Sequence, residues 1–165
     1  MRIRSLLATT FLLLLPLSRA GASEYPKMGA DIFDPHANGQ ADIDAAVAKA
    51  AAENKRVLLD FGANWCIWCH RLHNPFETDP AVAKALNDGF VVVMVDVNRR
   101  NGVDRNKDVI ARYDPALKGV PELAVLDSTG KELTIKDSGE LEEGDHHSPA
   151  KITAFLAQWA PTPRS

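Results

Sequence analysis

The chain has 165 residues, of which 45% are hydrophobic and 25% are charged; these ordinary values for one globular domain exclude a disordered chain and a large multidomain enzyme. The formal net charge is −3, from 22 acidic and 19 basic side chains, so composition offers no electrostatic footprint for binding nucleic acid. The two cysteines, Cys66 and Cys69, are too few and too close in sequence to staple a scaffold, so we expect their role to be chemical.

The first residues have the pattern of a secretory signal peptide. Arg2 and Arg4 precede an apolar run from Leu6 to Leu17, and Ala20 to Ala22 supply the small residues that a signal peptidase reads. The run is short of the roughly 20 residues that span a bilayer, which argues against the alternative of a retained anchor. We therefore expect residues 1–22 to be removed, leaving a periplasmic or secreted protein without a membrane span, in a compartment where disulfides persist.

The chain then divides into a lead-in, one domain and a tail. Residues 23–40 are rich in Pro, Gly and Asp and are predicted to be irregular, followed by a folded domain over 41–160 and a tail over 161–165. Apolar residues at helical spacing predict a helix over 42–54. The apolar run 56–61 shows no alternation, which predicts a central strand covered on both faces.

Two helices are expected after this strand. The first is predicted to open at Cys66, and Pro75 should bend or end it. Asp79 and Pro80 have the pattern of an N-cap and a first helical residue, and Gly89 is expected to end the second helix.

The second half of the domain alternates strands with short helical segments. The run 90–97 is β-branched and almost wholly apolar, which predicts another buried strand. A charged loop over 98–107 leads to a short helix over 109–113. Strands at 122–126 and 132–136 surround a tight turn and should pair as an antiparallel hairpin.

The last segment contains an acidic loop over 139–147, in which His146 and His147 are expected to be solvated. Ser148 and Pro149 should then begin a helix with one apolar face. That face is formed by Ile152, Phe155, Leu156 and Trp159. Helices that alternate with buried strands predict an α/β sandwich with helices on both faces of the sheet.

Cys66 and Cys69 lie one helical turn apart, close enough to form a disulfide and to break it again. If Cys66 begins the helix, its sulfur faces unpaired backbone N–H groups and the positive end of the helix dipole, which both favour the thiolate. Cys66 is therefore the expected nucleophile, and Cys69, one turn inside the helix, the thiol that resolves a mixed disulfide.

Three separated segments resemble the thioredoxin family. Residues 59–69 (LDFGANWCIWC) resemble its active-site segment, with an acidic residue six positions before the first cysteine. Residues 118–121 (KGVP), before the predicted hairpin, resemble its cis-proline loop. Residues 77–86 resemble the periplasmic thioredoxin-like domains of transmembrane thiol:disulfide interchange proteins. The resemblance covers residues 41–159 and implies a thioredoxin-like three-layer α/β/α sandwich with a central mixed sheet.

The resemblance implies a protein-disulfide oxidoreductase in which Cys66 is the nucleophile, Cys69 the resolving thiol and Asp60 a buried acid. Burial on a central strand should raise the pKa of Asp60, so that it can exchange a proton with Cys69, whereas a strand-end position would leave it in solvent. Pro121 is expected to be cis, holding the backbone of Val120 open for a partner chain; a trans turn proline would mean much less.

Residues around the motif depart from the family pattern. Ile67 and Trp68 stand between the cysteines, and the reduction potential depends on that dipeptide, so oxidase, reductase and relay stay open. The resemblance to interchange-protein domains favours a reductase or electron relay. Glu122 follows the proline, where many family members carry threonine, and its charge near the cysteines would oppose the thiolate and favour basic partners.

Trp65 and Trp68 either form an apolar platform for a partner chain beside the disulfide, or Trp65 packs against the sheet. Because there is no third cysteine, an external redox partner must supply or accept the electrons. The expected partners are therefore protein disulfides or dithiols and that redox protein. We expect a monomer that holds no metal or other cofactor and binds no nucleic acid.

A competing interpretation makes the chain a metal-binding or haem-binding delivery module without turnover. Cys66 to His70 matches the C-x-x-C-H pattern of covalent haem attachment, although the motif follows a buried strand and Met94, inside a strand, is a poor axial ligand. Cys66, Cys69, His70 and His73 carry donors that suit zinc or copper. Helical spacing brings His73 only approximately onto the cysteine face, so His70 and His73 are expected to line the rim, where a protonated imidazole would stabilise the thiolate.

Overall fold

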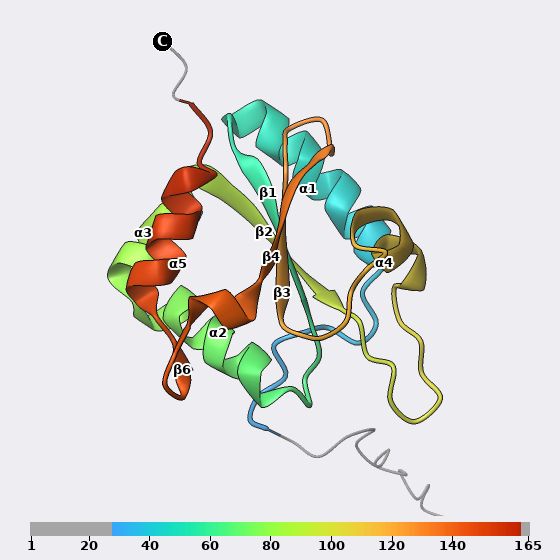
Figure 1. Cartoon of the computed structure of the whole chain (residues 1–165). Helices are drawn as coiled ribbons and strands as arrows, with labels where there is room; N and C mark the ends of the chain where they lie inside the picture. Colours follow the sequence, from blue (N-terminus) through green and yellow to red (C-terminus); the bar gives the residue numbers. More distant parts are fainter. Residues whose placement is uncertain (1–27, 163–165) are drawn as a thin grey trace, which may run out of the picture.

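The computed structural model describes residues 28–162 (Figure 1). The expected signal peptide at 1–22, the start of the lead-in and the last three residues lie outside this range. Within residues 28–162, no helix has the length and apolar character that crossing a membrane requires.

A four-stranded mixed sheet forms the centre of the domain, in the order β2-β1-β3-β4. β1 (Arg56–Gly62) pairs in parallel with β2 (Phe90–Asp96) and antiparallel with β3 (Glu122–Leu126). β3 also pairs antiparallel with β4 (Glu132–Asp137), which confirms the predicted hairpin. Because β1 has neighbours on both sides, its residues are buried from Val57 to Gly62, as its lack of alternation predicted.

β2 corrects one expectation. The strand is present, but it is the outer strand of the described sheet and is buried only in part. Val91, Val92 and Met94 are accordingly half-buried, whereas Val93 and Val95 are buried. An apolar run therefore identified the strand correctly but did not reveal its place in the sheet, which depends on pairing with distant segments.

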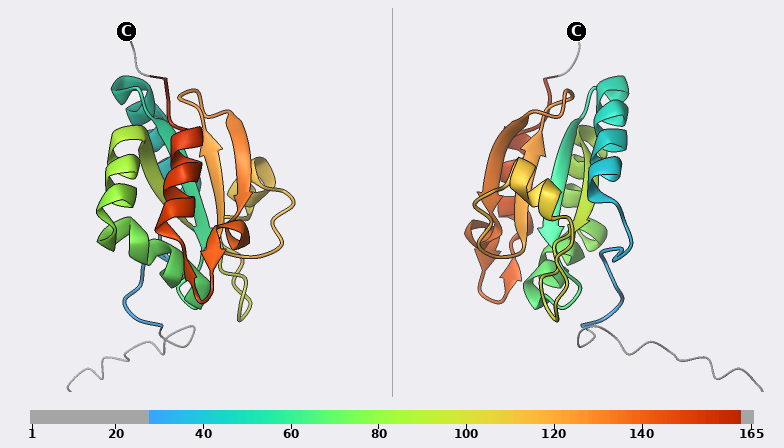
Figure 2. Two further views of the ribbon diagram at one scale, coloured as in Figure 1. Left: turned by 60° about the vertical axis from the view of Figure 1, so that its left-hand side comes forward. Right: turned by 90° about the vertical axis from the view of Figure 1, so that its right-hand side faces the viewer.

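Helices cover both faces of the sheet, which confirms the predicted three-layer sandwich (Figure 2). Leu59 of β1 packs with α1 and α4 on one face, and its neighbour Leu58 packs with α2, α3 and α5 on the other, as the alternation of side chains along a strand requires. The helices are α1 (Gly39–Glu53), α2 (Ile67–Thr78), α3 (Pro80–Gly89), α4 (Lys107–Tyr113) and α5 (Pro149–Gln158).

Most helix ends follow local sequence signals. α1 begins three residues before its predicted start, because the Asn38 side chain caps it by accepting a hydrogen bond from the N–H of Ala41. α3 has its predicted cap, with the Asp79 carboxylate accepting from the N–H groups of Ala81 and Val82. α4 and α5 also lie where they were predicted, although the Ser148 side chain makes no capping hydrogen bond.

Pro75 does not end α2. The helix continues for three residues to Thr78, and the N–H of Asp79 donates to the Pro75 carbonyl oxygen. Pro75 and Phe76 are buried, so tertiary packing holds the last turn despite the missing backbone donor.

The acidic stretch before α5 is folded and not a plain loop. It forms a short 3₁₀ helix, η1 (Ser138–Leu141), and a small hairpin of β5 (Glu142–Glu143) and β6 (His146–His147). His146 is exposed as expected, but His147 is only 1% exposed, because the hairpin turns it towards α2. There its ring meets the ring of Trp68 edge-on, with 5.6 Å between centroids. The prediction of solvated surface is therefore wrong for His147.

Candidate active site

Cys66 is the N-cap of α2, one residue before the first helical position expected for it. Its sulfur accepts a hydrogen bond from the N–H of Cys69 at 3.2 Å, and its thiol lies 3.5 Å from the Val120 carbonyl oxygen, to which it donates. Cys66 is 6% exposed and Cys69 is fully buried, and both are free thiols. The two sulfurs thus occupy the turn where β1 leads into α2, with Cys66 the more accessible.

The two thiols have pKa values shifted in opposite directions. The pKa of Cys66 is lowered to about 7, first by the hydrogen bond from the Cys69 thiol, then by backbone N–H groups of Cys69 and Trp68 and by the charge of Arg100, against an opposing effect of burial. Burial raises the pKa of Cys69, and the Cys66 sulfur raises it further. At neutral pH one sulfur is therefore poised as thiolate while the other keeps its proton.

Asp60 lies on the central strand β1 and is fully buried. Within the described residues, neither of its carboxylate oxygens has a hydrogen-bond partner. Desolvation, followed by the charge of Cys66, raises the pKa of Asp60 to about 8. The Asp60 charge in turn contributes to the raised pKa of Cys69, so the carboxyl and the buried thiol are electrostatically linked.

A lid of lead-in residues, which sequence reasoning missed, covers the buried thiol. Phe33 is 1% exposed and packs with Cys66 and Cys69 in one apolar cluster. Asn64, in the turn before Cys66, holds the backbone of Ile32 and Phe33 by three hydrogen bonds of 2.8 to 2.9 Å. Because these partners are more than thirty positions apart, no local pattern marked Phe33 as part of the site.

Trp65 is held by the loop that follows β2. Its indole N–H donates to the Asn98 side-chain oxygen at 2.8 Å, and the Arg100 guanidinium lies over its ring, 3.5 Å from the centroid. Arg100 is also the cation that contributes to the low pKa of Cys66, the part expected of the histidines. His70 instead has its Nε2 atom 2.9 Å from the Asn64 carbonyl oxygen, and His73 faces Glu77 at 3.3 Å.

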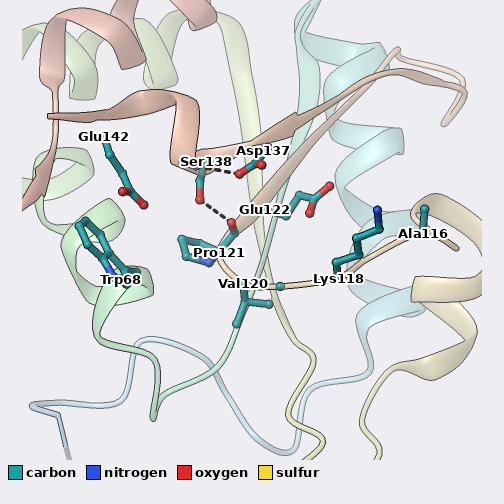
Figure 3. A pocket seen from close by; sticks show the side chains of 11 residues that line it. Trp68, Ala116, Lys118, Val120, Pro121, Glu122, Asp137, Ser138 and Glu142 are labelled. Atoms are coloured by element: carbon teal, nitrogen blue, oxygen red, sulfur yellow. Dashed lines mark hydrogen bonds between the residues drawn. The ribbon is translucent and has the colours of Figure 1, made fainter.

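The Val120–Pro121 peptide bond is cis, as predicted. Beside it opens a pocket of about 490 Å³ whose lining includes Trp68, Val120, Pro121 and Glu122 (Figure 3). The Ser138 hydroxyl donates to the Pro121 carbonyl oxygen and so ties η1 to this loop. The pocket therefore opens beside the loop whose Val120 carbonyl oxygen the Cys66 thiol contacts.

Glu122 lies in the wall of the pocket beside the cis-proline. Burial raises its pKa to about 7, with further contributions from the charge of Asp114, a hydrogen bond to Asp114 and the charge of Asp137, while Lys118 acts in the opposite direction. Glu122 and Asp137 are direct cross-strand partners on β3 and β4. Like charges are thus concentrated beside the cis-proline.

The metal and haem interpretations gain no geometric support. Among residues 28–162, no group of three or more His, Cys, Asp or Glu side chains is arranged to hold a metal ion. The Nε2 atom of His70, which haem ligation would need, is engaged by the Asn64 carbonyl.

The sequence of this chain is similar to those of known proteins. The thioredoxin-like family matches residues 38–128. The chain is 31% identical over 123 residues to thiol:disulfide interchange protein DsbD 2 of Pseudomonas aeruginosa, a match that covers 74% of this chain and 19% of that protein. It is 30% identical over 121 residues to DsbD of Ralstonia nicotianae, covering 73% and 19%. The chain thus spans about a fifth of the length of these curated relatives.

Solved structures of other proteins are also similar to this chain. A disulphide isomerase from Xylella fastidiosa Temecula1 superposes with a TM-score of 0.67 and 31% identity, covering 77% of this chain and 95% of that one. The DsbH oxidoreductase, at 17% identity and a TM-score of 0.52, covers 91% and 93% and shares the fold. With the family match over more than half of its length, the chain belongs to the thioredoxin-like family.

Proposed function

We propose that this protein is an exported thiol-disulfide oxidoreductase that reduces or exchanges disulfides in partner proteins through Cys66 and Cys69. The observation that carries the proposal is the asymmetry of the two thiols. Cys66, the less buried one, is the N-cap of α2 and has its pKa lowered to about 7, whereas Cys69 is fully buried and has its pKa raised. A thiol with a pKa near ambient pH attacks disulfides most efficiently. Cys69 keeps its proton during this attack and acts as the nucleophile only in the second step.

In the first step the Cys66 thiolate attacks one sulfur of a partner disulfide. The partner's S–S bond breaks, a Cys66–partner disulfide forms, and the other partner sulfur leaves as a thiolate that takes a proton from solvent. In the second step Cys69 loses its proton and attacks the Cys66 sulfur. The Cys66–Cys69 disulfide forms, the second partner thiol is released, and two electrons have passed from this protein to its partner.

Asp60 is proposed as the acceptor of the Cys69 proton. Part of its raised pKa comes from the negative charge of Cys66. Formation of the mixed disulfide removes that charge, so the pKa of Asp60 falls when the base is needed. The carboxylate and the Cys69 thiol share a buried site, where a proton lost by one group is readily taken by the other.

The partner chain is proposed to lie extended beside Val120 and Pro121, against Trp68 and near Trp65. The carbonyl oxygen of Val120 lies 3.5 Å from the Cys66 sulfur, so backbone pairing at Val120 would bring a partner disulfide to the nucleophile. The pocket beside Pro121 gives room for the partner's flanking side chains.

The relatives and the N-terminal pattern support the proposed direction of electron flow and the proposed location. Curated relatives are thiol:disulfide interchange proteins, which supports a reductase or electron relay. The signal-peptide pattern of residues 1–22 supports action in the periplasm or after secretion. With two cysteines in the whole sequence, the monomer proposed here needs an external redox protein to restore its dithiol.

The test is turnover of insulin disulfides with dithiothreitol as electron source. Wild type should reduce insulin, Cys66→Ser should abolish turnover, and Cys69→Ser should accumulate a Cys66–insulin disulfide that a thiol reagent releases. Turnover that survives Cys66→Ser would exclude Cys66 as the nucleophile. No turnover in wild type, together with tight copper binding, would favour the delivery module instead. Equilibration with glutathione buffers then gives the reduction potential and so the direction of electron flow.

A further inference from the structure

Two pockets of opposite charge flank the loop that lies against Cys66. The pocket of about 490 Å³ lies on the Pro121 side and carries the carboxylates of Glu122, Asp137 and Glu142 (Figure 3). A second pocket, of about 230 Å³, has Arg99 and Arg100 in its wall. Both pockets share Lys118, Gly119 and Val120 as their common border. A disulfide held at Cys66 therefore lies between an acidic side and a basic side.

The acidic side gathers the carboxyl groups of Glu122, Asp137 and Glu142 in one pocket wall, with Lys118 as the cation among the lining residues. Burial raises the pKa of Glu122 to about 7, and the nearby carboxyl groups of Asp114 and Asp137 raise it further. Asp114 interacts with Glu122 and is 1% exposed, and its Oδ2 atom has no hydrogen-bond partner within the described residues. Lys118 offsets part of this charge. A cationic side chain from outside would relieve the rest.

The basic side is held in place by stacking. The Arg100 guanidinium lies over the Trp65 ring at 3.5 Å from the centroid, and the Trp65 indole is itself fixed by Asn98. Arg99 and Arg100 are exposed, and the Arg100 charge reaches Cys66, whose pKa it lowers. An arginine held by stacking is well suited to receive a carboxylate.

We infer that the loop 118–121 selects partner segments that carry a basic side chain on one side of the reactive cysteine and an acidic side chain on the other. This inference rests on the proposed function, because it concerns the substrate of the same two thiols. An extended segment beside Val120 would send its flanking side chains to the two pockets, the basic one towards Glu122 and Glu142 and the acidic one towards Arg99 and Arg100. Complementary charges of this kind govern the rate and the orientation of encounter more than the final affinity.

Two isomeric peptides test the inference. Both have a central cysteine flanked by alanines; one places lysine before and glutamate after this core, and the other reverses them. The cysteine is activated as a mixed disulfide with 2-thiopyridine. Cys66 attacks the peptide sulfur and expels pyridine-2-thione, which absorbs light; Cys69 then displaces the reduced peptide and closes the Cys66–Cys69 disulfide. The peptides share composition and net charge, so a rate difference reports the order of the charges alone.

At low salt, one isomer should react about fivefold faster with the reduced protein than the other, and the ratio should fall towards one at high salt. Reaction of both peptides with dithiothreitol corrects for any intrinsic difference in reactivity. Equal corrected rates at low salt would overturn the inference.

Variants assign the selection to the pockets. The double variant Glu122→Gln/Glu142→Gln should bring the isomer ratio close to one, and Arg99→Gln/Arg100→Gln should reduce it. Glu143→Gln is the matched control, because Glu143 neighbours Glu142 on β5 but lies outside the pocket lining, so the ratio should stay as in wild type. The ratio cancels any change in the reactivity of Cys66 itself. A wild-type ratio in both double variants would exclude selection by these pockets.

The release of pyridine-2-thione distinguishes a wrong charge selection from a wrong proposed function. If Cys66→Ser releases pyridine-2-thione as fast as wild type, the assignment of Cys66 fails. If release depends on Cys66 but both isomers react equally, the oxidoreductase stands and the charge selection is wrong.

Discussion

Asn64 holds the backbone of Phe33 from two directions. The N–H of Phe33 donates to the Asn64 side-chain oxygen at 2.8 Å, and the Asn64 side-chain nitrogen donates to the Phe33 carbonyl oxygen at 2.8 Å. The same Asn64 oxygen accepts from the N–H of Ile32 at 2.9 Å. The turn that presents Cys66 is thereby joined to the segment that covers Cys69.

Removal of this link should loosen the lid over the buried thiol. Asn64→Ala deletes three hydrogen bonds and leaves buried backbone groups of residues 32 and 33 without partners, so we expect the free energy of unfolding to fall by about 2–4 kcal/mol. Cys69 should also react faster with iodoacetamide in the folded protein. Denaturant unfolding and mass spectrometry of the alkylated protein measure the two effects. Asn74→Ala, an exposed change on α2, is the control, and equal behaviour of the two variants would contradict the role of Asn64.

Gly62 leaves space for the lid, and filling that space should destabilise the site. A Cβ atom at position 62 would lie 2.2 Å from the Phe33 Cζ atom and 3.0 Å from the Cys69 sulfur. Gly62→Ala is therefore expected to lower the free energy of unfolding by ~1–3 kcal/mol through overpacking. Gly119→Ala, where no atom lies within 4 Å of the added carbon, should change stability little. If Phe33→Leu does not reduce the loss in a double-mutant cycle, the proposed clash is not its cause.

Asp60 should make the reduced protein less stable as the pH rises. Its pKa is about 8 in the folded state against 3.8 for an ordinary aspartate, so between these values the folded state binds more protons than the unfolded state. The contribution of Asp60 to stability is then greatest below about pH 4 and is lost progressively up to about pH 8, with a full span on the order of 5 kcal/mol. Asp60→Asn should remove this slope and be more stable than wild type at pH 8. The free energy of unfolding of both proteins is measured by denaturant unfolding from pH 4 to 8. If it changes with pH equally in wild type and in Asp60→Asn, the raised pKa of Asp60 is wrong.

Asp60→Asn should also change the second chemical step. The variant lacks the proposed acceptor for the Cys69 proton, so release of the partner from the mixed disulfide should slow, with a changed pH dependence. Attack by Cys66 should be affected less, because the first causes of its low pKa are hydrogen bonds from Cys69 and Trp68. Stopped-flow measurement separates the two steps, and an unaltered pH profile for partner release would rule out Asp60 as the proton acceptor.

His147 should make the protein more stable as the pH rises, which is the opposite of the effect expected for Asp60. Burial lowers its pKa to about 4 from an ordinary 6.5, so between these values the unfolded state binds more protons and stability rises with pH. Its contribution is therefore lost as the pH falls from about 6.5 to 4. His147→Phe keeps an aromatic ring against Trp68 and removes the titrating group, so it should lose less stability on acidification than wild type. Matched losses in both proteins over that pH range would contradict the prediction, and His146→Phe, an exposed change, is the control.

The sequence predicted those parts of the fold that local signals encode. Asp79 and Pro80 marked the start of α3, and the apolar runs marked β1 and β2, because caps and hydrophobic runs act over a few residues. The edge position of β2 was not predicted, and the sequence left open whether Pro75 would bend or end the helix, which continues to Thr78. Both depend on packing against segments distant in the chain, which overrides local propensity.

For the site, local patterns were enough to predict the two cysteines one turn apart at a helix start, with Asp60 on the preceding strand and Pro121 in a separate loop. These residues fall within motifs short enough to recognise. Four features became visible in the folded chain alone: Phe33 packs over Cys69, Arg100 and not a histidine supplies the cation, the His147 ring meets Trp68, and opposite charges flank Val120. The physical reason is that burial, electrostatic coupling and pocket shape arise from contacts between segments far apart in the chain, which no local pattern records.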